Sequence, residues 1–194
     1  MLNLILISTS LTLHNVIIKL SLRRGFMKTM LEEERFHFIS DENKAFILAF
    51  NDEITKLGYD FGGNIGSGFC WGKYMIIYSK SGVKSKQVAA RIYIRENSIV
   101  LRLFLNKIDK HCEYIENSKN FIKDVFISDY GTCKHCHNEK DGICKFRKSY
   151  SLDNKFIEKC NGITFEFWEP NLDKLADYID LLREFYPVRR TRTV

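Results

Sequence analysis

The stretch QVAARIYIRENSIVLRLFL, residues 87–105, decides the fold class. It contains two runs of alternating apolar and polar side chains, which is the pattern of a half-buried β-hairpin. A two-residue loop at Asn97-Ser98 places Ile94 opposite Leu101 and gathers the apolar side chains of both strands on one face. A three-residue loop would instead place arginines and apolar side chains together on the same face of the hairpin. The opposite face of the predicted hairpin carries Arg91, Tyr93, Arg95, Val100, Arg102 and Phe104.

Further strands and helices are predicted on both sides of this hairpin. Strands are expected at residues 73–78 and 163–168, which are rich in aromatic and β-branched residues. Helices are expected at residues 41–57, 106–116, 118–126 and 172–186, after the capping residues Ser40, Asn106, Ser118 and Asn171. This order predicts an α+β fold with a mostly antiparallel sheet, flanking helices and a cysteine-rich, zinc-ribbon-like insert.

Four of the six cysteines form one cluster in the sequence. Cys133 and Cys136 form a Cys-x-x-Cys turn, Cys144 follows after seven residues, and Cys160 after fifteen more. The residues between the last two are predicted to form a β-hairpin with its turn at 152–154. Because the open ends of a hairpin meet, Cys144 and Cys160 can complete a tetrahedral sulfur site with the first two. Four thiolates suit a structural Zn²⁺ ion.

Other ligand sets and other cysteine chemistry stay open. His135 or His137 could replace Cys160 in a site of three cysteines and one histidine. The four cysteines would also suit an iron–sulfur cluster, a disulfide pair or a redox dithiol. We favour zinc on four cysteines, because the hairpin delivers Cys160 without further assumptions.

Basic residues lie close to this cluster in the sequence. Lys134, Lys145 and Arg147 can help to hold the thiolates ionised, and this role competes with any role in binding phosphate. The other two cysteines, Cys70 and Cys112, stand apart and are predicted to be buried, apolar side chains.

The length and the charge distribution predict a single domain with two unusual ends. The chain has 194 residues and a net charge of +6, but residues 1–26 and 189–194 each contribute +3, so the remainder is neutral. A nucleic-acid-binding domain normally carries its excess charge on a folded face. We predict a dispensable or non-native extension over residues 1–30, one domain over residues 31–188 with the insert at 131–162, and a basic tail.

The apolar residues 2–20 do not resemble a targeting segment. They are interrupted by Ser, Thr, His and Asn, and no basic region precedes them. A membrane segment followed by Arg23 and Arg24 stays the minority alternative, and we expect a cytoplasmic protein.

No catalytic motif is recognisable. The glycine-rich residues 61–72 follow a predicted helix and precede a strand, so they lack the context of a phosphate-binding loop. We predict a turn-rich connector with aromatic anchors there. His111 is predicted to be a surface or packing residue, and Glu166 a solvated carboxylate on a strand.

Two functions from different classes are compatible with these features. The first is a zinc-stabilised binding module for nucleic acid or another partner, because guanidinium groups and aromatic rings together can neutralise phosphates and stack on bases. Its predicted contact residues are Arg91, Tyr93, Arg95, Arg102, Lys145 and Arg147. The alternative is a small-ligand or enzymatic domain whose pocket lies between residues 61–72 and the sheet. The predicted walls of that pocket are Trp71, Tyr74 and Tyr93.

Overall fold

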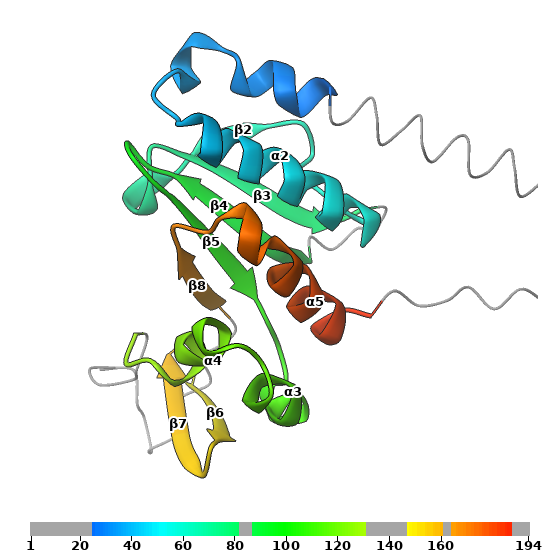
Figure 1. Ribbon diagram of the computed structural model, residues 1–194, viewed down its shortest axis with the longest axis vertical. Coiled ribbons are helices and arrows are strands. Elements are labelled where there is room, and N and C mark those ends of the chain that lie inside the picture. Colours follow the sequence, from blue (N-terminus) through cyan, green and yellow to red (C-terminus); the bar gives the residue numbers. More distant parts are fainter. Residues whose placement is uncertain (1–24, 82–86, 131–146, 161–163, 188–194) are drawn as a thin grey trace, which may run out of the picture.

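The computed structural model describes residues 25–81, 87–130, 147–160 and 164–187, which form an α+β fold (Figure 1). The main sheet has six strands in the order β1-β3-β4-β5-β8, with β2 also paired to β3, and its pairings are antiparallel. A separate antiparallel sheet pairs β6 with β7. The strands are β1 (Tyr59–Asp60), β2 (Ile65–Ser67), β3 (Tyr74–Lys80), β4 (Val88–Ile94), β5 (Ile99–Phe104), β6 (Arg147–Leu152), β7 (Lys155–Cys160) and β8 (Thr164–Trp168).

Two helices, α2 and α5, cover one face of the main sheet (Figure 1). The helices are α2 (Asp41–Lys56), α3 (Cys112–Glu116), α4 (Asn120–Ile127) and α5 (Leu175–Phe185), with short 3-10 turns η1 (Glu34–Phe36), η2 (Phe69–Trp71), η3 (Ile108–Lys110) and η4 (Leu172–Lys174). The predicted α+β class, with a mostly antiparallel sheet and flanking helices, is confirmed. Within the described ranges, no helix has both the length and the hydrophobicity needed to cross a bilayer.

The hairpin of β4 and β5 has the predicted faces but a different register. Ile94 pairs with Ile99 rather than with Leu101, because the turn is centred on Glu96-Asn97 instead of one residue later. Moving a turn by one residue shifts the strand pairing by two. Since side chains alternate between the two faces of a strand, an even shift leaves every side chain on its predicted face.

The hairpin of β6 and β7 is confirmed, with a shorter turn than predicted. Leu152 still pairs with Lys155, so only Asp153 and Asn154 form the turn. Both turn residues have positive φ angles, 47° and 61°, as a type I′ turn requires. Asp and Asn tolerate this backbone better than other non-glycine residues, which explains why the turn falls there.

Two of the predicted helix caps are confirmed. Ser40 Oγ accepts a hydrogen bond from Asn43 N at 3.3 Å at the start of α2. Asn171 Oδ1 accepts one from Lys174 N at 3.2 Å, and this bond opens η4, which leads into α5. Gly58 ends α2 with a φ of 82°, a conformation that favours glycine.

The other two predicted caps are wrong. Ser118 does not open α4: its hydroxyl donates to the Tyr114 carbonyl at 2.7 Å, at the end of α3, and Lys119 precedes α4. Asn106 does not open a long helix either, because the next residue, Lys107, has a left-handed backbone with a φ of 57°. The short elements η3 and α3 follow instead.

The packed part of the chain begins before the predicted boundary at residue 31. Residues 25–31 are helical, and Met27, at 0% exposure, belongs to the main hydrophobic core. Met30 and Leu31 are buried in the same core. A deletion of residues 1–29 would therefore remove a core side chain.

Lys159 fixes the β6–β7 hairpin to the end of α4. Its ammonium group donates to the carbonyl oxygens of Val125 and Tyr130 at 3.1 and 2.9 Å, and to Ser128 Oγ at 3.3 Å. Burial of the side chain lowers the pKa of Lys159 to about 8. The lysine thus supplies a donor to the Val125 carbonyl oxygen, which lies in the last turn of α4 and has no intrahelical partner, and also binds two oxygens just beyond the helix.

Replacing Lys159 by Met is expected to lower the free energy of unfolding by about 2 kcal/mol, because three hydrogen bonds from a charged donor are lost. The exposed Lys155 on the same strand is the matched control. Its replacement by Met should change the stability by less than about 0.5 kcal/mol. Urea unfolding of both variants measures the difference, and equal effects would contradict an anchoring role for Lys159.

Candidate binding face of the sheet

The predicted contact residues of β4 and β5 lie on the sheet face that points away from α2 and α5. Strand pairing places a first row of side chains across this face: Met75, Tyr93, Val100 and Trp168. The next row across the same face is Ile77, Arg91, Arg102 and Glu166. The antiparallel register thus brings β8, far along the chain, next to the central hairpin.

The first row is covered at its centre and open at its β8 end. Tyr93 is only 2% exposed, and the Trp71 ring lies 6.0 Å from its ring, centroid to centroid. A base therefore has no free face of Tyr93 on which to stack, which corrects the role predicted for this residue. Trp168 is 51% exposed and is the accessible ring of the row.

The second row contains a buried ion pair that the sequence alone did not reveal. Arg102 Nε donates to Glu166 Oε1 at 2.7 Å, and a second guanidinium nitrogen contacts the same oxygen. The Glu166 side chain is 2% exposed, so the prediction of a solvated carboxylate is wrong. The Arg102 guanidinium also lies over the Trp71 ring, 4.3 Å from its centroid. Burial and the nearby Glu166 raise the pKa of Tyr130, beside Trp71, to about 12.

The other two arginines of this face differ in accessibility. Arg91 Nη1 donates to the Tyr93 hydroxyl at 3.2 Å, and its guanidinium lies 4.9 Å from the centroid of Phe104. Arg95 is exposed, and its guanidinium lies 5.0 Å from the centroid of the Trp168 ring. Of the arginines predicted as contacts on this face, Arg95 is therefore the one best placed to meet a partner.

Arg95 also borders a hollow of about 360 Å³ at the end of the sheet. The hollow is lined by Phe69, Cys70, Trp71, Gly72, Lys73, Arg95 and Glu96. Phe69 is 80% exposed and has a left-handed backbone with a φ of 51°. We refer to Phe69, Trp71, Lys73, Arg95 and Trp168 as the end patch.

The glycine-rich loop positions the end patch by close backbone packing. A Cβ atom on Gly68 would lie 2.3 Å from the carbonyl oxygen of Gly72. A Cβ atom on Gly72 would lie 2.8 Å from the carbonyl oxygen of Ile94, at the end of β4. These two glycines therefore let η2 lie against the sheet, where Trp71 covers Tyr93. The loop is a connector with aromatic residues, as predicted, although Phe69 extends into solvent.

The predicted small-ligand pocket lacks one of its walls. Tyr74 lies on the opposite face of the sheet, where its ring packs against Phe36 at 4.9 Å and Phe38 at 6.2 Å, centroid to centroid. Trp71 and Tyr93 lie on the outer face. The three aromatic residues therefore do not enclose one cavity, because alternate residues of a strand point to opposite faces.

The predicted zinc ligands fall mostly outside the described residues. Cys133, Cys136 and Cys144 lie there, as do the alternative ligands His135 and His137 and the basic Lys145. Cys160 ends β7 with an exposed side chain and lies opposite Arg147. Arg147 lies 3.6 Å from Glu158, measured from Nη1 to Oε1. In the part of the chain that the structure describes, no three His, Cys, Asp or Glu residues are grouped as metal ligands.

Cys70 and Cys112, the two cysteines outside the cluster, differ in burial. Cys70 is exposed beside the end patch, so the prediction of a buried thiol is wrong for it. Cys112 is half-buried, and its Sγ contacts the Ile108 carbonyl oxygen at 3.4 Å.

Comparisons of the chain with protein-family models, curated proteins and solved structures found no match.

Proposed function

We propose that the protein is a zinc-stabilised binding module that holds single-stranded nucleic acid on its end patch. The observation that carries this proposal is the stacked pair of Arg95 and Trp168, in which both side chains are accessible to solvent. Bases stack on exposed aromatic rings, and an adjacent guanidinium adds cation–π and phosphate contacts. Phe69 offers a second accessible ring in the hollow that Arg95 also lines.

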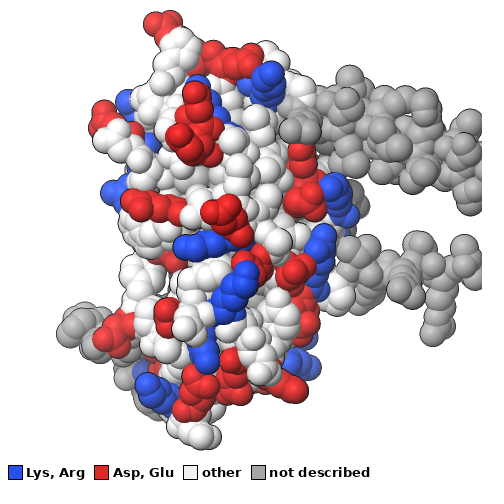
Figure 2. All heavy atoms as spheres, in the orientation of Figure 1, with Lys and Arg blue, Asp and Glu red and all other residues white. Residues whose placement is uncertain are grey.

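The charge distribution favours single strands over duplexes. Recognition of a duplex depends on many phosphate contacts, but residues 27–188 carry equal numbers of basic and acidic residues. Figure 2 shows the face that bears α2, where acidic and basic side chains are interspersed without an extended basic area. A patch of a few rings with one or two cations suits a stacking mode, and because it neutralises few phosphates the affinity should depend only weakly on salt.

The zinc part of the proposal rests on the four-cysteine spacing and on the confirmed β6–β7 hairpin. Cys160 ends this hairpin with an exposed thiol, as a ligand at the open end requires. Zn²⁺ bound to Cys133, Cys136, Cys144 and Cys160 would be structural, because a closed four-thiolate site leaves no position for a substrate. The ion would tie the segment with Cys133, Cys136 and Cys144 to the end of β7, and it would take no part in a reaction.

Replacing Trp168 by Ala is expected to weaken the binding of single-stranded oligonucleotides about 5- to 150-fold, which corresponds to the 1–3 kcal/mol of one stacked base. The matched control is Phe156→Ala, since Phe156 is also an exposed ring, 70% accessible, but lies on β7 away from the end patch. Fluorescence anisotropy of labelled RNA and DNA measures both variants at several salt concentrations.

Removing residues 189–194 tests whether the basic tail, rather than the end patch, binds the nucleic acid. If the end patch binds the strand, this deletion lowers the salt dependence but leaves the loss caused by Trp168→Ala unchanged. The proposal is wrong if the deletion alone abolishes binding, or if the intact protein binds neither RNA nor DNA at low salt.

A further inference from the structure

A second hollow, of about 490 Å³, lies between β6 and the chain at residues 105–109. Its volume is in the range of small-molecule sites. Three of its lining side chains, Lys107, Arg147 and Lys148, are basic, and one, Asp109, is acidic. None of its lining residues belongs to the end patch, so a ligand in this hollow would not occupy the proposed nucleic-acid site.

The two lysines of this hollow are available to a ligand. Lys107 and Lys148 are exposed, and neither forms an ion pair with another residue in the described ranges. Arg147 differs, because its Nη1 lies 3.6 Å from Glu158 Oε1, so part of its charge is already offset. Lys107 and Lys148 are therefore the two cations that an anion in the hollow would meet.

The backbone of Lys107 is unusual for a lysine. Its φ angle is 57°, in the left-handed region that Gly, Asn and Asp adopt at lower cost. Residues held in such conformations are enriched at ligand sites. Local folding would thus be served better by Asn or Gly at this position, and the long cationic side chain calls for another explanation.

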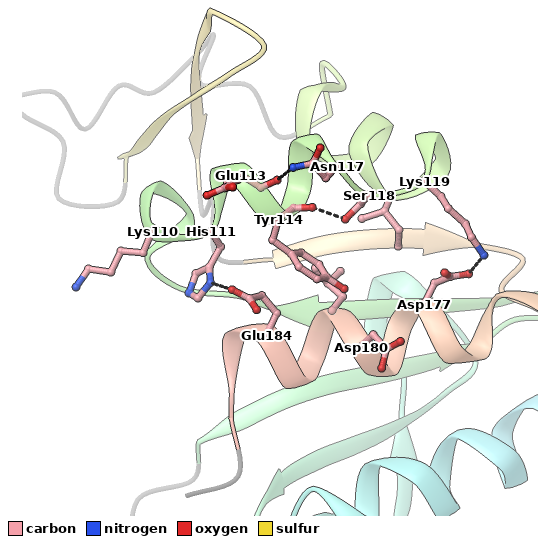
Figure 3. A pocket seen from close by; sticks show the side chains of 12 residues that line it. Lys110, His111, Glu113, Tyr114, Asn117, Ser118, Lys119, Asp177, Asp180 and Glu184 are labelled. Atoms are coloured by element: carbon pink, nitrogen blue, oxygen red, sulfur yellow. Dashed lines mark hydrogen bonds and ion pairs between the residues drawn. The ribbon is translucent and has the colours of Figure 1, made fainter.

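The wall at residues 105–109 is fixed to the rest of the fold from behind. His111 Nδ1 lies 2.8 Å from Glu184 Oε1, which ties the chain after η3 to α5 (Figure 3). On the other side, the Tyr186 hydroxyl donates to the carbonyl oxygen of Phe104, at the end of β5. A ligand in the hollow therefore meets a wall that is already positioned.

The opposite wall is the edge of β6 that does not pair with β7. The two-residue turn closes on the hydrogen-bonded pair of Leu152 and Lys155, so the amide of Ser149 points away from β7. Ser149 lines the hollow between this edge and residues 105–109. Its N–H group is thus a third donor, beside the two ammonium groups, and donors from both walls can surround one oxyanion.

We propose that this hollow binds the phosphate group of a small phosphomonoester. A phosphomonoester carries a charge of about −1.5 to −2 at neutral pH, which matches the two unpaired lysines. Its three terminal oxygens can accept from Lys107, Lys148 and the Ser149 amide at the same time. A carboxylate has a single charge and two oxygens, so it would satisfy fewer of these donors. The volume leaves room for an organic group as well as the phosphate.

The test titrates the full chain with inorganic phosphate and with glycerol 3-phosphate, and isothermal titration measures binding. Acetate and glycerol are the matched probes, because one supplies a singly charged anion and the other the organic group alone. Both phosphate compounds are expected to bind at millimolar concentration or below, and acetate and glycerol about tenfold more weakly or not at all. No binding of phosphate, or equal binding of acetate, would overturn the proposal.

Variants of two neighbouring lysines separate this site from a general effect of charge. Lys107→Asn should weaken phosphate binding about tenfold, because one charge-assisted contact is lost. The melting temperature should not fall, since Asn tolerates a left-handed backbone. Lys110→Asn is the matched control, because Lys110 lies on the same short element, η3, but does not line the hollow. Equal losses of binding in the two variants would refute the site.

A terminal phosphate of a nucleic acid has the same chemistry, and a further comparison distinguishes it from a small molecule. Oligonucleotides with and without a 5′ phosphate are expected to bind equally, and Trp168→Ala should leave the affinity for glycerol 3-phosphate unchanged. If the 5′ phosphate strengthens oligonucleotide binding and Lys107→Asn removes that gain, the phosphate belongs to the strand, and the assignment to a small molecule is wrong. Failure of the end patch to bind any strand would leave the phosphate titration unaffected.

Discussion

Arg102→Met is expected to destabilise the protein by about 3–5 kcal/mol. The substitution leaves the Glu166 carboxylate, 2% exposed, without the guanidinium that contacts it. A buried charge that loses its partner is among the most destabilising single changes in a folded protein. Urea unfolding at neutral pH measures the loss. The same substitution also removes the cation that lies over Trp71.

Two further variants isolate the contribution of the ion pair. Arg95→Met removes an arginine from the same face, but this side chain is exposed and should change stability by less than about 0.5 kcal/mol. The double variant Arg102→Met, Glu166→Leu removes both charges and should recover most of the lost stability, because apolar pairs often replace buried ion pairs without loss. If the double variant is as unstable as Arg102→Met, the unpaired charge is not the cause.

On the proposed four-cysteine site, Cys144→Ser is expected to reduce the zinc content from one equivalent per chain to almost none, and to make the chain around Lys140 sensitive to protease. Structural zinc sites supply about 10–16 kcal/mol of binding free energy in isolated zinc-finger peptides, and this binding is coupled to folding. No short hairpin can replace a contribution of that size. Elemental analysis of protein purified without added metal, followed by limited proteolysis, measures both effects.

The rest of the β6–β7 hairpin should survive this substitution. The Tyr150 hydroxyl donates to the Phe126 carbonyl oxygen at 2.7 Å, and Lys159 binds the end of α4. These contacts hold the hairpin without the metal. Cys70→Ser is the control, because Cys70 is exposed outside the four-cysteine cluster and should leave the zinc content unchanged. A folded wild-type protein without metal, or one with a brown iron chromophore, would refute the zinc assignment.

Local signals in the sequence predicted the faces of β4 and β5 and most of the longer elements correctly. The period of two in β4 and β5 assigns each side chain to a face, and the Ser40 cap depends only on residues within one helical turn. The predicted register was wrong because a turn at Glu96-Asn97 and a turn at Asn97-Ser98 both place the apolar side chains of the hairpin on one face. The apolar pattern therefore does not distinguish the two turns. The Ser118 cap failed because serine hydroxyls can also bond to a carbonyl four residues earlier.

The contacts that build the candidate sites could not be predicted, because they join residues far apart in the sequence. Arg102 and Glu166 are 64 residues apart, and they meet only because β8 pairs with β5. His111 and Glu184 are 73 residues apart. The sequence identifies each of these residues as polar on a helix or strand, but the partner depends on which elements become neighbours.

The positions of the two tryptophans give the protein two distinct optical reporters. Trp71 lies against Tyr93 under the Arg102 guanidinium, whereas Trp168 is half exposed at the β8 end of the row that contains Tyr93. Acrylamide should therefore quench the redder component of the intrinsic emission, from Trp168, more strongly than the component from Trp71. A nucleic-acid strand bound to the end patch would protect the Trp168 emission from acrylamide. Unfolding of the outer face of the sheet would alter the Trp71 emission.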